Sequence, residues 1–187
     1  MSITIQAERI GRLLGDLLGR KVTATTAASP ISGVEPTLTA VYEDNEGNVV
    51  AACCCDLDLV LNAGAALVLV PARDVQESAK AKKWDPLLVE NFKEILNVCA
   101  QLFCQAGSPR AKLGCLCLTC SQANAKSTVA ASPLAKGGKR VDVQLSIAGY
   151  ASGRMAVFTG LSGRALQCSA CPTRVVQPNT TDRTAAL

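Results

Sequence analysis

Hydrophobic residues near the start of the chain recur at the spacing of one face of a helix. The recurring positions are Ile5, Ile10, Leu13, Leu14, Leu17 and Leu18. They predict an amphipathic helix over residues 4–19, which Gly19 ends. Gly11 and Gly15 each lower its intrinsic stability by about 1 kcal/mol relative to Ala, and we expect them to allow close packing instead. The Thr- and Val-rich run at 21–27 predicts a strand.

Two β-like runs follow, at residues 37–42 and 48–55, on either side of the acidic segment 43–48. A short turn that contains glycine, between two such runs, indicates a β-hairpin. The acidic turn also suggests a calcium loop, but the ligand spacing of an EF-hand is absent. We therefore favour the hairpin.

The middle of the chain predicts two helices with a polar connection between them. Asp56 suits the N-cap of a helix from Leu57 to about Val70, which Pro71 ends. Residues 72–83 are polar and indicate a connecting segment.

The clearest helical pattern begins at Asp85 and Pro86, which supply an N-cap and the first helical position. We expect this helix to run to about Gln105. One side is apolar and consists of Leu88, Phe92, Ile95, Cys99, Leu102 and Phe103. The other side is a narrow polar stripe that consists of Glu90, Glu94, Asn97 and Gln101.

Strands dominate the rest of the chain. Residues 111–119 alternate in a way typical of a buried strand, with Leu113, Cys115 and Cys117 expected on one face. Residues 120–138 predict a long surface loop. Alternation over 140–148, a turn, and a partner strand over 155–159 predict a second hairpin.

This order of elements shows no sustained βαβ alternation and no Gly-rich phosphate loop. It predicts an α+β fold, a mostly antiparallel sheet with long helices packed on one side. We expect one domain over residues 1–160 and a flexible C-terminal tail over 161–187.

The composition narrows the chemistry. The 187 residues are 49% hydrophobic and include no histidine. Enzymes that rely on a Ser-His-Asp triad, a Cys-His pair or an H-E-x-x-H zinc site are therefore excluded. The ten cysteines include three consecutive ones, and we expect reduced thiols that pack as small hydrophobic groups.

Partners and location are predicted from charge and hydropathy. The net charge of +4 is mild and the basic residues are dispersed, so nothing favours nucleic-acid binding. The longest apolar run, Leu57 to Pro71, is interrupted by Asp58 and Asn62 and is shorter than the ~20 residues of a membrane helix. The first residues do not resemble a signal peptide. We expect a cytoplasmic protein without membrane insertion.

One pair on the polar stripe suggests chemistry. Glu94 and Asn97 form the only Glu-x-x-Asn sequence of the chain, and on a helix they lie one turn apart on the same side. The carboxylate is suited to an ion pair with a partner's lysine. The amide is suited to holding a water molecule for attack on a partner's phosphoryl group, where positioning supplies much of the catalysis.

Several segments together resemble a known family. They are the helix ending Leu17-Leu-Gly19, the strand Lys21-Val-Thr-Ala, the helical Ala63-Gly-Ala-Ala-Leu67, the segment Asn91-Phe-Lys-Glu94-Ile-Leu-Asn97-Val-Cys-Ala-Gln-Leu-Phe103, and the strand pair from Val141 to Tyr150. Across residues 4–160 the chain resembles the CheC/CheX chemotaxis phosphatases, which are related to the FliM, FliN and FliY flagellar-switch proteins.

The resemblance implies a phosphatase for the aspartyl-phosphate of a response-regulator receiver domain in two-component signalling. Glu94 would form a salt bridge with a receiver lysine, and Asn97 would align the attacking water. Glu90, Lys93 and Gln101 would complete the partner-binding surface. The receiver would hold the Mg²⁺, so the chain needs no metal or cofactor of its own. The family also allows a homodimer.

Two features depart from the family pattern. Glu90 stands where Asp or Ser is usual, four residues before the Glu, and Cys120 stands where a downstream Pro is usual. The family's two-site members carry a second Glu-x-x-Asn helix, whereas residues 57–70 offer only Asn62.

Two alternatives remain. Some relatives with this fold bind partners without catalysis, and the chain would then be an adaptor or a dimerising interaction domain. Exposure of Glu94 and Asn97 distinguishes the two functions, since burial within the fold excludes catalysis. The second alternative is a structural zinc site, because Cys117 with Cys120 and Cys168 with Cys171 have the spacing of zinc half-sites.

Overall fold

The computed structural model describes residues 5–32, 35–104, 110–119 and 138–161. Its helices are α1 (Ala7–Leu18), α2 (Leu57–Leu67), α3 (Ala72–Lys80), α4 (Pro86–Cys99) and the 3₁₀ turn η1 (Ala100–Phe103). Its strands are β1 (Val22–Thr26), β2 (Thr37–Glu43), β3 (Val49–Asp56), β4 (Lys112–Thr119), β5 (Lys139–Ile147) and β6 (Gly153–Thr159).

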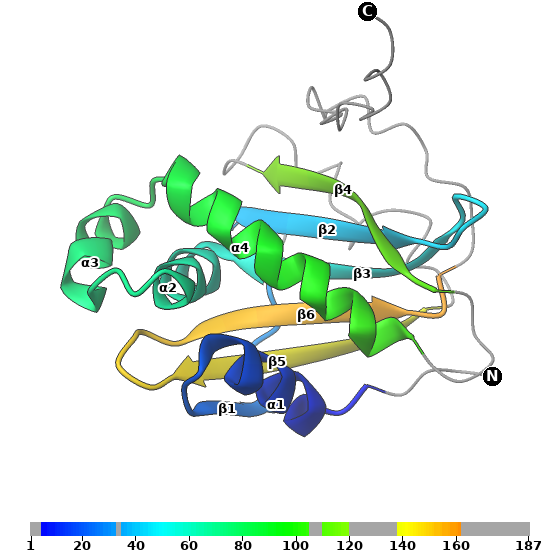
Figure 1. The fold of residues 1–187 in the computed structure, drawn as a ribbon, viewed down its shortest axis with the longest axis horizontal. Helices are drawn as coiled ribbons and strands as arrows, with labels where there is room; N and C mark the ends of the chain where they lie inside the picture. Colours follow the sequence, from blue (N-terminus) through cyan, green and yellow to red (C-terminus); the bar gives the residue numbers. More distant parts are fainter. Residues whose placement is uncertain (1–4, 33–34, 105–109, 120–137, 162–187) are drawn as a thin grey trace, which may run out of the picture.

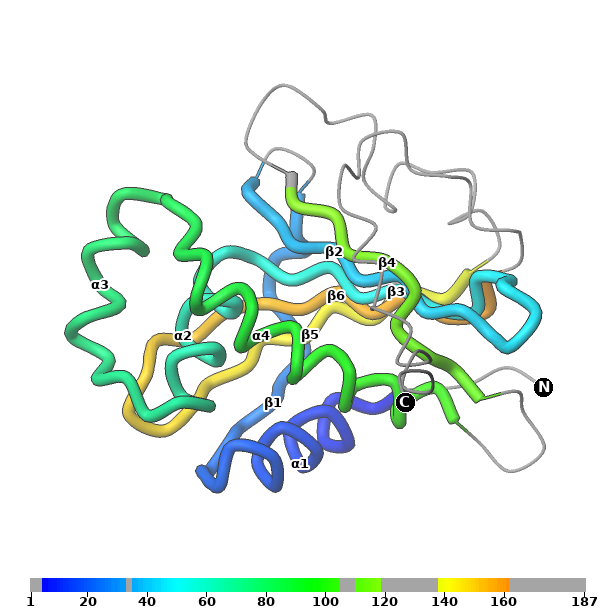
Figure 2. The backbone as a smooth tube through the Cα atoms, turned by 45° about the horizontal axis from the view of Figure 1, so that its top comes forward, coloured from blue at the N-terminus to red at the C-terminus, as the bar shows by residue number. Residues whose placement is uncertain are grey.

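The strands form one six-stranded sheet in the order β1-β5-β6-β3-β2-β4. Every neighbouring pair is antiparallel. Helices α1, α2 and α4 cover one face of this sheet, and α3 lies beyond its end (Figure 1). The same two layers are evident in the tilted view (Figure 2). The predicted α+β class, with helices on one side of an antiparallel sheet, is confirmed.

The order of elements along the chain repeats once. Each half consists of a helix, an edge strand and a hairpin, as α1-β1-β2-β3 and then α4-β4-β5-β6. In the sheet, each edge strand pairs with the hairpin of the other half, and β3 pairs with β6 at the centre. Helix α4 therefore has α1 as its topological counterpart, with α2 and α3 joining the halves.

The main core lies between the helices and the sheet. Residues from α1, α2 and α4 pack there on inward-facing strand positions such as Cys53, Cys55 and Val143. Cys54, between the first two, belongs to a smaller cluster on the opposite face, with Phe158 of β6. This division follows from the two-residue period of a strand.

Two glycines allow α1 to lie close to the sheet and stop where the sequence predicts. A Cβ at Gly11 would lie 2.9 Å from the Cβ of Ala24 in β1, so a larger residue does not fit without a shift. Gly19 adopts φ +60° at the C-cap, a conformation that glycine enters without strain. The predicted helix end and the close packing are confirmed.

Both predicted N-caps are present. A carboxylate oxygen of Asp56 accepts a hydrogen bond from the backbone of Leu59 at 2.9 Å. Asp85 accepts from the first turn of α4 in the same way, with Pro86 at the first helical position. Such caps satisfy backbone N–H groups that have no partner within the helix.

The acidic turn is a hairpin, as predicted, between β2 and β3. The carboxylate of Asp44 accepts from the backbone N–H groups of Glu46 and Asn48, at 2.9 and 2.8 Å. The side-chain amide of Asn48 also donates to this carboxylate. Together these hydrogen bonds lower the pKa of Asp44, and the bond from the Asn48 side chain has the largest effect. The carboxylate thus shapes the turn.

Two expectations about regular structure were wrong. Residues 72–83 are not merely a connection, because α3 occupies most of them, although only Val75 of that helix is buried. Strand β4 is not buried on both faces but lies at the edge of the sheet. A register shift opposite Val41 and Tyr42 breaks its alternation, so that Leu113 and Leu116, expected on opposite faces, pack against the same core.

Several expectations fall on other residues. The loop over 120–138 and the tail over 161–187 lie outside the described residues, apart from their end positions. Within the described ranges, no helix is long and apolar enough to cross a membrane.

Candidate functional site

The candidate site lies on α4, the longest helix of the described residues. The helix crosses the sheet diagonally, from the end near α3 to η1 (Figure 1). Its inward side contributes the residues expected to be apolar, and each is buried: Leu88, Phe92, Ile95 and Cys99, followed by Leu102 and Phe103 of η1. The phase of these residues turns the opposite side of α4 towards solvent.

The four polar positions of the stripe are all exposed. Glu90, Glu94, Asn97 and Gln101 follow one another at intervals of three or four residues, so they share one side of the helix. Because Glu94 and Asn97 are exposed and not buried within the fold, the structure does not exclude catalysis by this pair.

Among the described residues, Glu94 and Asn97 form a side-chain hydrogen bond with each other and with no other side chain. The Asn97 amide nitrogen donates to a Glu94 carboxylate oxygen at 3.4 Å, which is long for a hydrogen bond. The contact holds the two side chains over the same patch of helix surface. It leaves one carboxylate oxygen of Glu94 and the amide oxygen of Asn97 free for a partner and a water.

Glu90 and Lys93 interact with each other one turn before that pair. The Lys93 ammonium lies 3.0 Å from a carboxylate oxygen of Glu90. The ion pair is solvent-accessible and contributes less than about 1 kcal/mol to stability. Its effect on the site is to orient Lys93, the only cationic residue of α4, towards Glu90.

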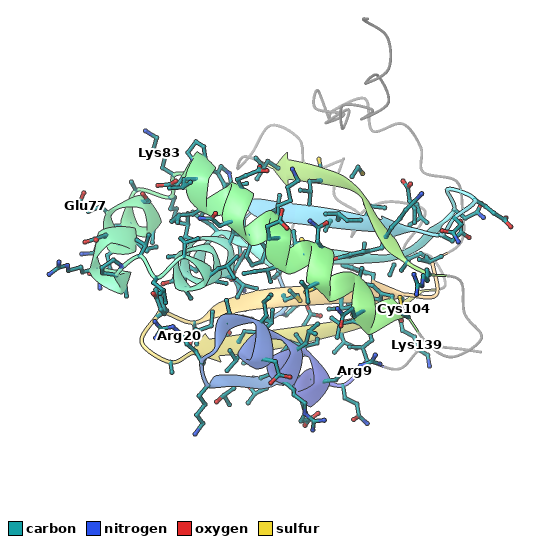
Figure 3. All side chains as sticks on the ribbon, in the orientation of Figure 1. Arg9, Arg20, Glu77, Lys83, Cys104 and Lys139 are labelled. Atoms are coloured by element: carbon teal, nitrogen blue, oxygen red, sulfur yellow. The ribbon has the colours of Figure 1, made fainter. Side chains whose placement is uncertain are left out.

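Arg9 is a neighbour of the stripe that the sequence did not reveal. Its guanidinium donates to the backbone oxygen of Gln101 at 3.2 Å, which attaches α1 to the far end of the stripe. Figure 3 shows Arg9 and Cys104 at that end of α4 and Lys83 at the other end. The two partners are 92 residues apart in sequence, so no local pattern signals the contact.

Buried contacts fix α4 on the layers beneath it. The hydroxyl of Tyr42 in β2 donates to the backbone oxygen of Leu96 at 2.8 Å. Burial raises the pKa of Tyr42 well above its ordinary value of 10.0, so the hydroxyl keeps the proton that it donates. At Gly64 in α2, a Cβ would lie 2.3 Å from the backbone oxygen of Leu88, so the two helices touch through their backbones.

The counterpart helix α1 carries no second pair. Glu8 of α1 is exposed, but the residue three positions later is Gly11, whose packing against Ala24 leaves no room for a side chain. In α2, Asn62 is buried and accepts from the backbone of Ala151 at 3.1 Å, which is a structural role. Within the described residues, α4 alone presents the Glu-x-x-Asn pair.

Most thiols of the described residues are buried in the core or lie in β4, and Cys104, just after η1, is partly buried against the core. Cys53, Cys55 and Cys99 are fully buried and unbridged. Burial raises the pKa of Cys99 from an ordinary value of 9.0 to about 12, and it also raises the pKa of Cys53 and Cys55. A neutral buried thiol is neither a nucleophile nor a metal ligand.

The zinc alternative falls largely outside the described residues, since of its four cysteines only Cys117 belongs to them. Cys117 is a buried residue of β4. Over the ranges that the structure describes, no three His, Cys, Asp or Glu residues are grouped so that they could hold a metal ion.

The arrangement on α4 suits recognition followed by water positioning. A free carboxylate oxygen attracts a cationic group, and an amide one turn away both donates and accepts hydrogen bonds without changing its charge. Both groups lie on a helix fixed to a sheet, which is the precondition for holding a reactant in place.

Comparison of sequences gives no relative. No protein-family model matches the chain, and no curated protein matches it.

Comparison of structures does find proteins of similar fold. FliY from Thermotoga maritima aligns with a TM-score of 0.54 and 12% identity, over 85% of this chain and 85% of that one. FliM from H. pylori, in its complex with SpeE, aligns with a TM-score of 0.51 and 11% identity, over 82% and 80%. The CheX–CheY complex from Borrelia burgdorferi gives a TM-score of 0.47 and 10% identity, over 83% and 98%.

The FliY and FliM alignments each cover more than four fifths of this chain. At such low identity they establish an architecture. The chain has the fold of the FliM and FliY flagellar-switch proteins, and the resemblance expected from its sequence is confirmed for the fold.

Proposed function

We propose that this protein accelerates hydrolysis of the aspartyl-phosphate of a response-regulator receiver domain. The observation that carries the proposal is the exposed pair on α4, with Glu94 and Asn97 one turn apart and directed at solvent. The family resemblance of the segment 91–103 supports the same function. Glu90, Lys93 and Gln101 surround the pair and contribute to partner binding.

In the proposed mechanism, the receiver docks on the exposed side of α4. The Glu94 carboxylate forms an ion pair with a receiver lysine and so sets the register of docking. The Asn97 amide oxygen accepts a hydrogen bond from a water and orients its lone pair at the phosphorus atom, opposite the aspartyl oxygen. The P–O bond to the aspartate breaks as the water oxygen bonds to phosphorus, and inorganic phosphate leaves.

Positioning is the whole contribution of this chain. Phosphoryl transfer needs an aligned nucleophile and neutralised charge. Mg²⁺ held by the receiver would neutralise the charge on the phosphoryl group, so the chain itself requires neither a metal nor an activated base. The absence of histidine from the sequence is compatible with this chemistry.

A non-catalytic adaptor is the second candidate. FliM, which has this fold, is found in a complex with SpeE, so the fold serves protein binding in at least one relative. In that case the stripe on α4 would be a docking surface only.

The two candidates are separated by phosphate release from receiver domains of the same organism, charged with a small phosphodonor. The native protein is compared with Glu94→Ala and Asn97→Ala, both exposed positions where the fold should tolerate the change. At receiver concentrations below saturation, we expect acceleration by the native protein and its loss in both variants. Binding of a receiver without acceleration would favour the adaptor.

A further inference from the structure

Leu87, in the first turn of α4, exposes most of its side chain to solvent. Its exposed fraction is 64%, whereas its neighbour Leu88 is buried at 4% and packs in a cluster with α2. Single exposed leucines are common and need no function. What distinguishes Leu87 is its position relative to the candidate site.

Leu87 continues the exposed stripe towards the start of the helix. At about 100° per residue, the positions of Leu87, Glu90, Glu94, Asn97 and Gln101 fall within roughly 80° of the helix circumference. With a rise of about 1.5 Å per residue, Leu87 lies ~10 Å along the axis from Glu94 and ~15 Å from Asn97. The stripe is therefore apolar at its N-terminal end and polar over the rest.

A partner that engages the pair must also cover Leu87. Specific interfaces bury about 800 Å² on each partner, which corresponds to a patch roughly 30 Å across. A patch of that size centred on Glu94 and Asn97 extends over Leu87. Leu87 lies inside that patch, so docking removes its side chain from water, and the gain in affinity follows the apolar area that is buried.

We propose that Leu87 is the apolar anchor of receiver docking on α4, so that it sets affinity while Asn97 sets the rate of the chemical step. This inference rests on the proposed function for the identity of the partner. It predicts that the receiver has an apolar surface ~15 Å from its phosphorylated aspartate, the distance between Leu87 and Asn97 along the helix.

The fold itself does not need the Leu87 side chain. The backbone N–H of Leu87 donates to Asp85 at 2.9 Å, and any residue except proline preserves that bond. Inward packing at this turn is supplied by Leu88. Replacement of Leu87 should therefore leave the fold intact.

The test is a titration of the full chain with a receiver domain that carries beryllofluoride and Mg²⁺ as a stable phosphoryl mimic. Leu87→Ser is compared with Leu87→Met, which keeps an apolar side chain, and with Leu69→Ser. Leu69 is 70% exposed in the turn after α2, so it matches Leu87 in exposure but lies off α4.

We expect Leu87→Ser to raise the dissociation constant about tenfold, which is the loss anticipated for a partly buried leucine. Leu87→Met and Leu69→Ser should stay within twofold of the native protein. In a separate assay with saturating phosphorylated receiver, the rate of phosphate release should be the same for Leu87→Ser and the native chain, since the anchor does not touch the reacting atoms.

Equal affinities for Leu87→Ser and the native protein would overturn the anchor and leave the proposed phosphatase intact. Weaker binding by Leu87→Ser, in a protein that binds receivers but never accelerates phosphate release, would support the anchor and contradict the phosphatase. No binding of any receiver by the native protein would overturn both.

Discussion

The buried hydroxyl of Tyr42 in β2 donates a 2.8 Å hydrogen bond to the backbone oxygen of Leu96, the residue before Asn97. The helix tightens here, because the N–H of Ala100 bonds to Asn97 and Val98 rather than to Leu96. The carbonyl of Leu96 is thereby released from the regular helical pattern, and Tyr42 satisfies it. The tyrosine thus connects the sheet to the backbone that presents the candidate site.

Removal of this hydroxyl should destabilise the protein. Tyr42→Phe keeps the ring that packs on Phe103, with centroids 4.7 Å apart, but leaves the Leu96 carbonyl buried without a donor. We expect a loss of about 1–3 kcal/mol in the free energy of unfolding, measured by urea denaturation. An unchanged denaturation midpoint would show that water or another group replaces the hydroxyl.

For Gly64→Ala, helix propensity and packing predict changes of opposite sign in the free energy of unfolding. Helix propensity alone predicts that Gly64→Ala stabilises α2 by about 1 kcal/mol. Packing predicts the opposite, because the new Cβ would lie 2.3 Å from the Leu88 backbone oxygen and must displace α4. We expect a net loss of about 1–3 kcal/mol in thermal or urea unfolding. A gain in stability would contradict the close approach of the two helices.

The buried thiols predict stability that declines in alkali. Burial raises the pKa of Cys99 from 9.0 to about 12, so the folded protein retains a proton that the unfolded chain releases. This contribution is complete below pH 9 and is lost as the pH rises towards 12. We expect unfolding free energy to fall over this window, and to fall less steeply in Cys99→Ala. Identical slopes for the two proteins would argue against a buried Cys99.

Asp56 serves two groups, and a double-mutant cycle separates them. Its carboxylate caps α2 through Leu59 at 2.9 Å and accepts from Arg154 of β6 at 3.0 Å. Arg154 also pairs with Glu35. We expect Asp56→Ala to cost about 1–3 kcal/mol and Asp56→Asn, which keeps a capping oxygen, to cost less. With Arg154→Met as the second change, additive effects would contradict a coupled pair.

Much of the fold follows from periodicity. The apolar residues of α1 and α4, the alternation of β5 and the turn chemistry of Asp44 each identify an element in its own segment of sequence. Exposure of Glu94 and Asn97 follows in the same way, because Phe92, Ile95 and Cys99 fix the buried side of the helix. These are local signals, and the structure confirms the elements that they predict.

Other features depend on contacts that no local pattern records. Helix α3 was missed because Val75 alone is buried on it, which leaves almost no apolar period to detect. The edge position of β4 depends on strand order, and its irregular alternation depends on the register shift opposite Tyr42. The contact of Arg9 with Gln101 joins distant parts of the chain. Tertiary pairing, and not composition, decides each of these.

The most direct measurement of the central claim is the decay of a phosphorylated receiver at saturating and subsaturating concentrations of this protein. The proposed roles predict different losses. Asn97→Ala should lower kcat about 100-fold or more, because the water is no longer held, while KM changes little. Glu94→Ala should mainly raise KM. Glu77→Ala, at an exposed position of α3 away from the stripe, is the matched control.

A lower kcat for Asn97→Ala, with Glu77→Ala close to the native protein, is the result that the account predicts. Equal decay of the receiver with native protein, with Asn97→Ala and with no protein added would contradict it, provided that all variants remain folded.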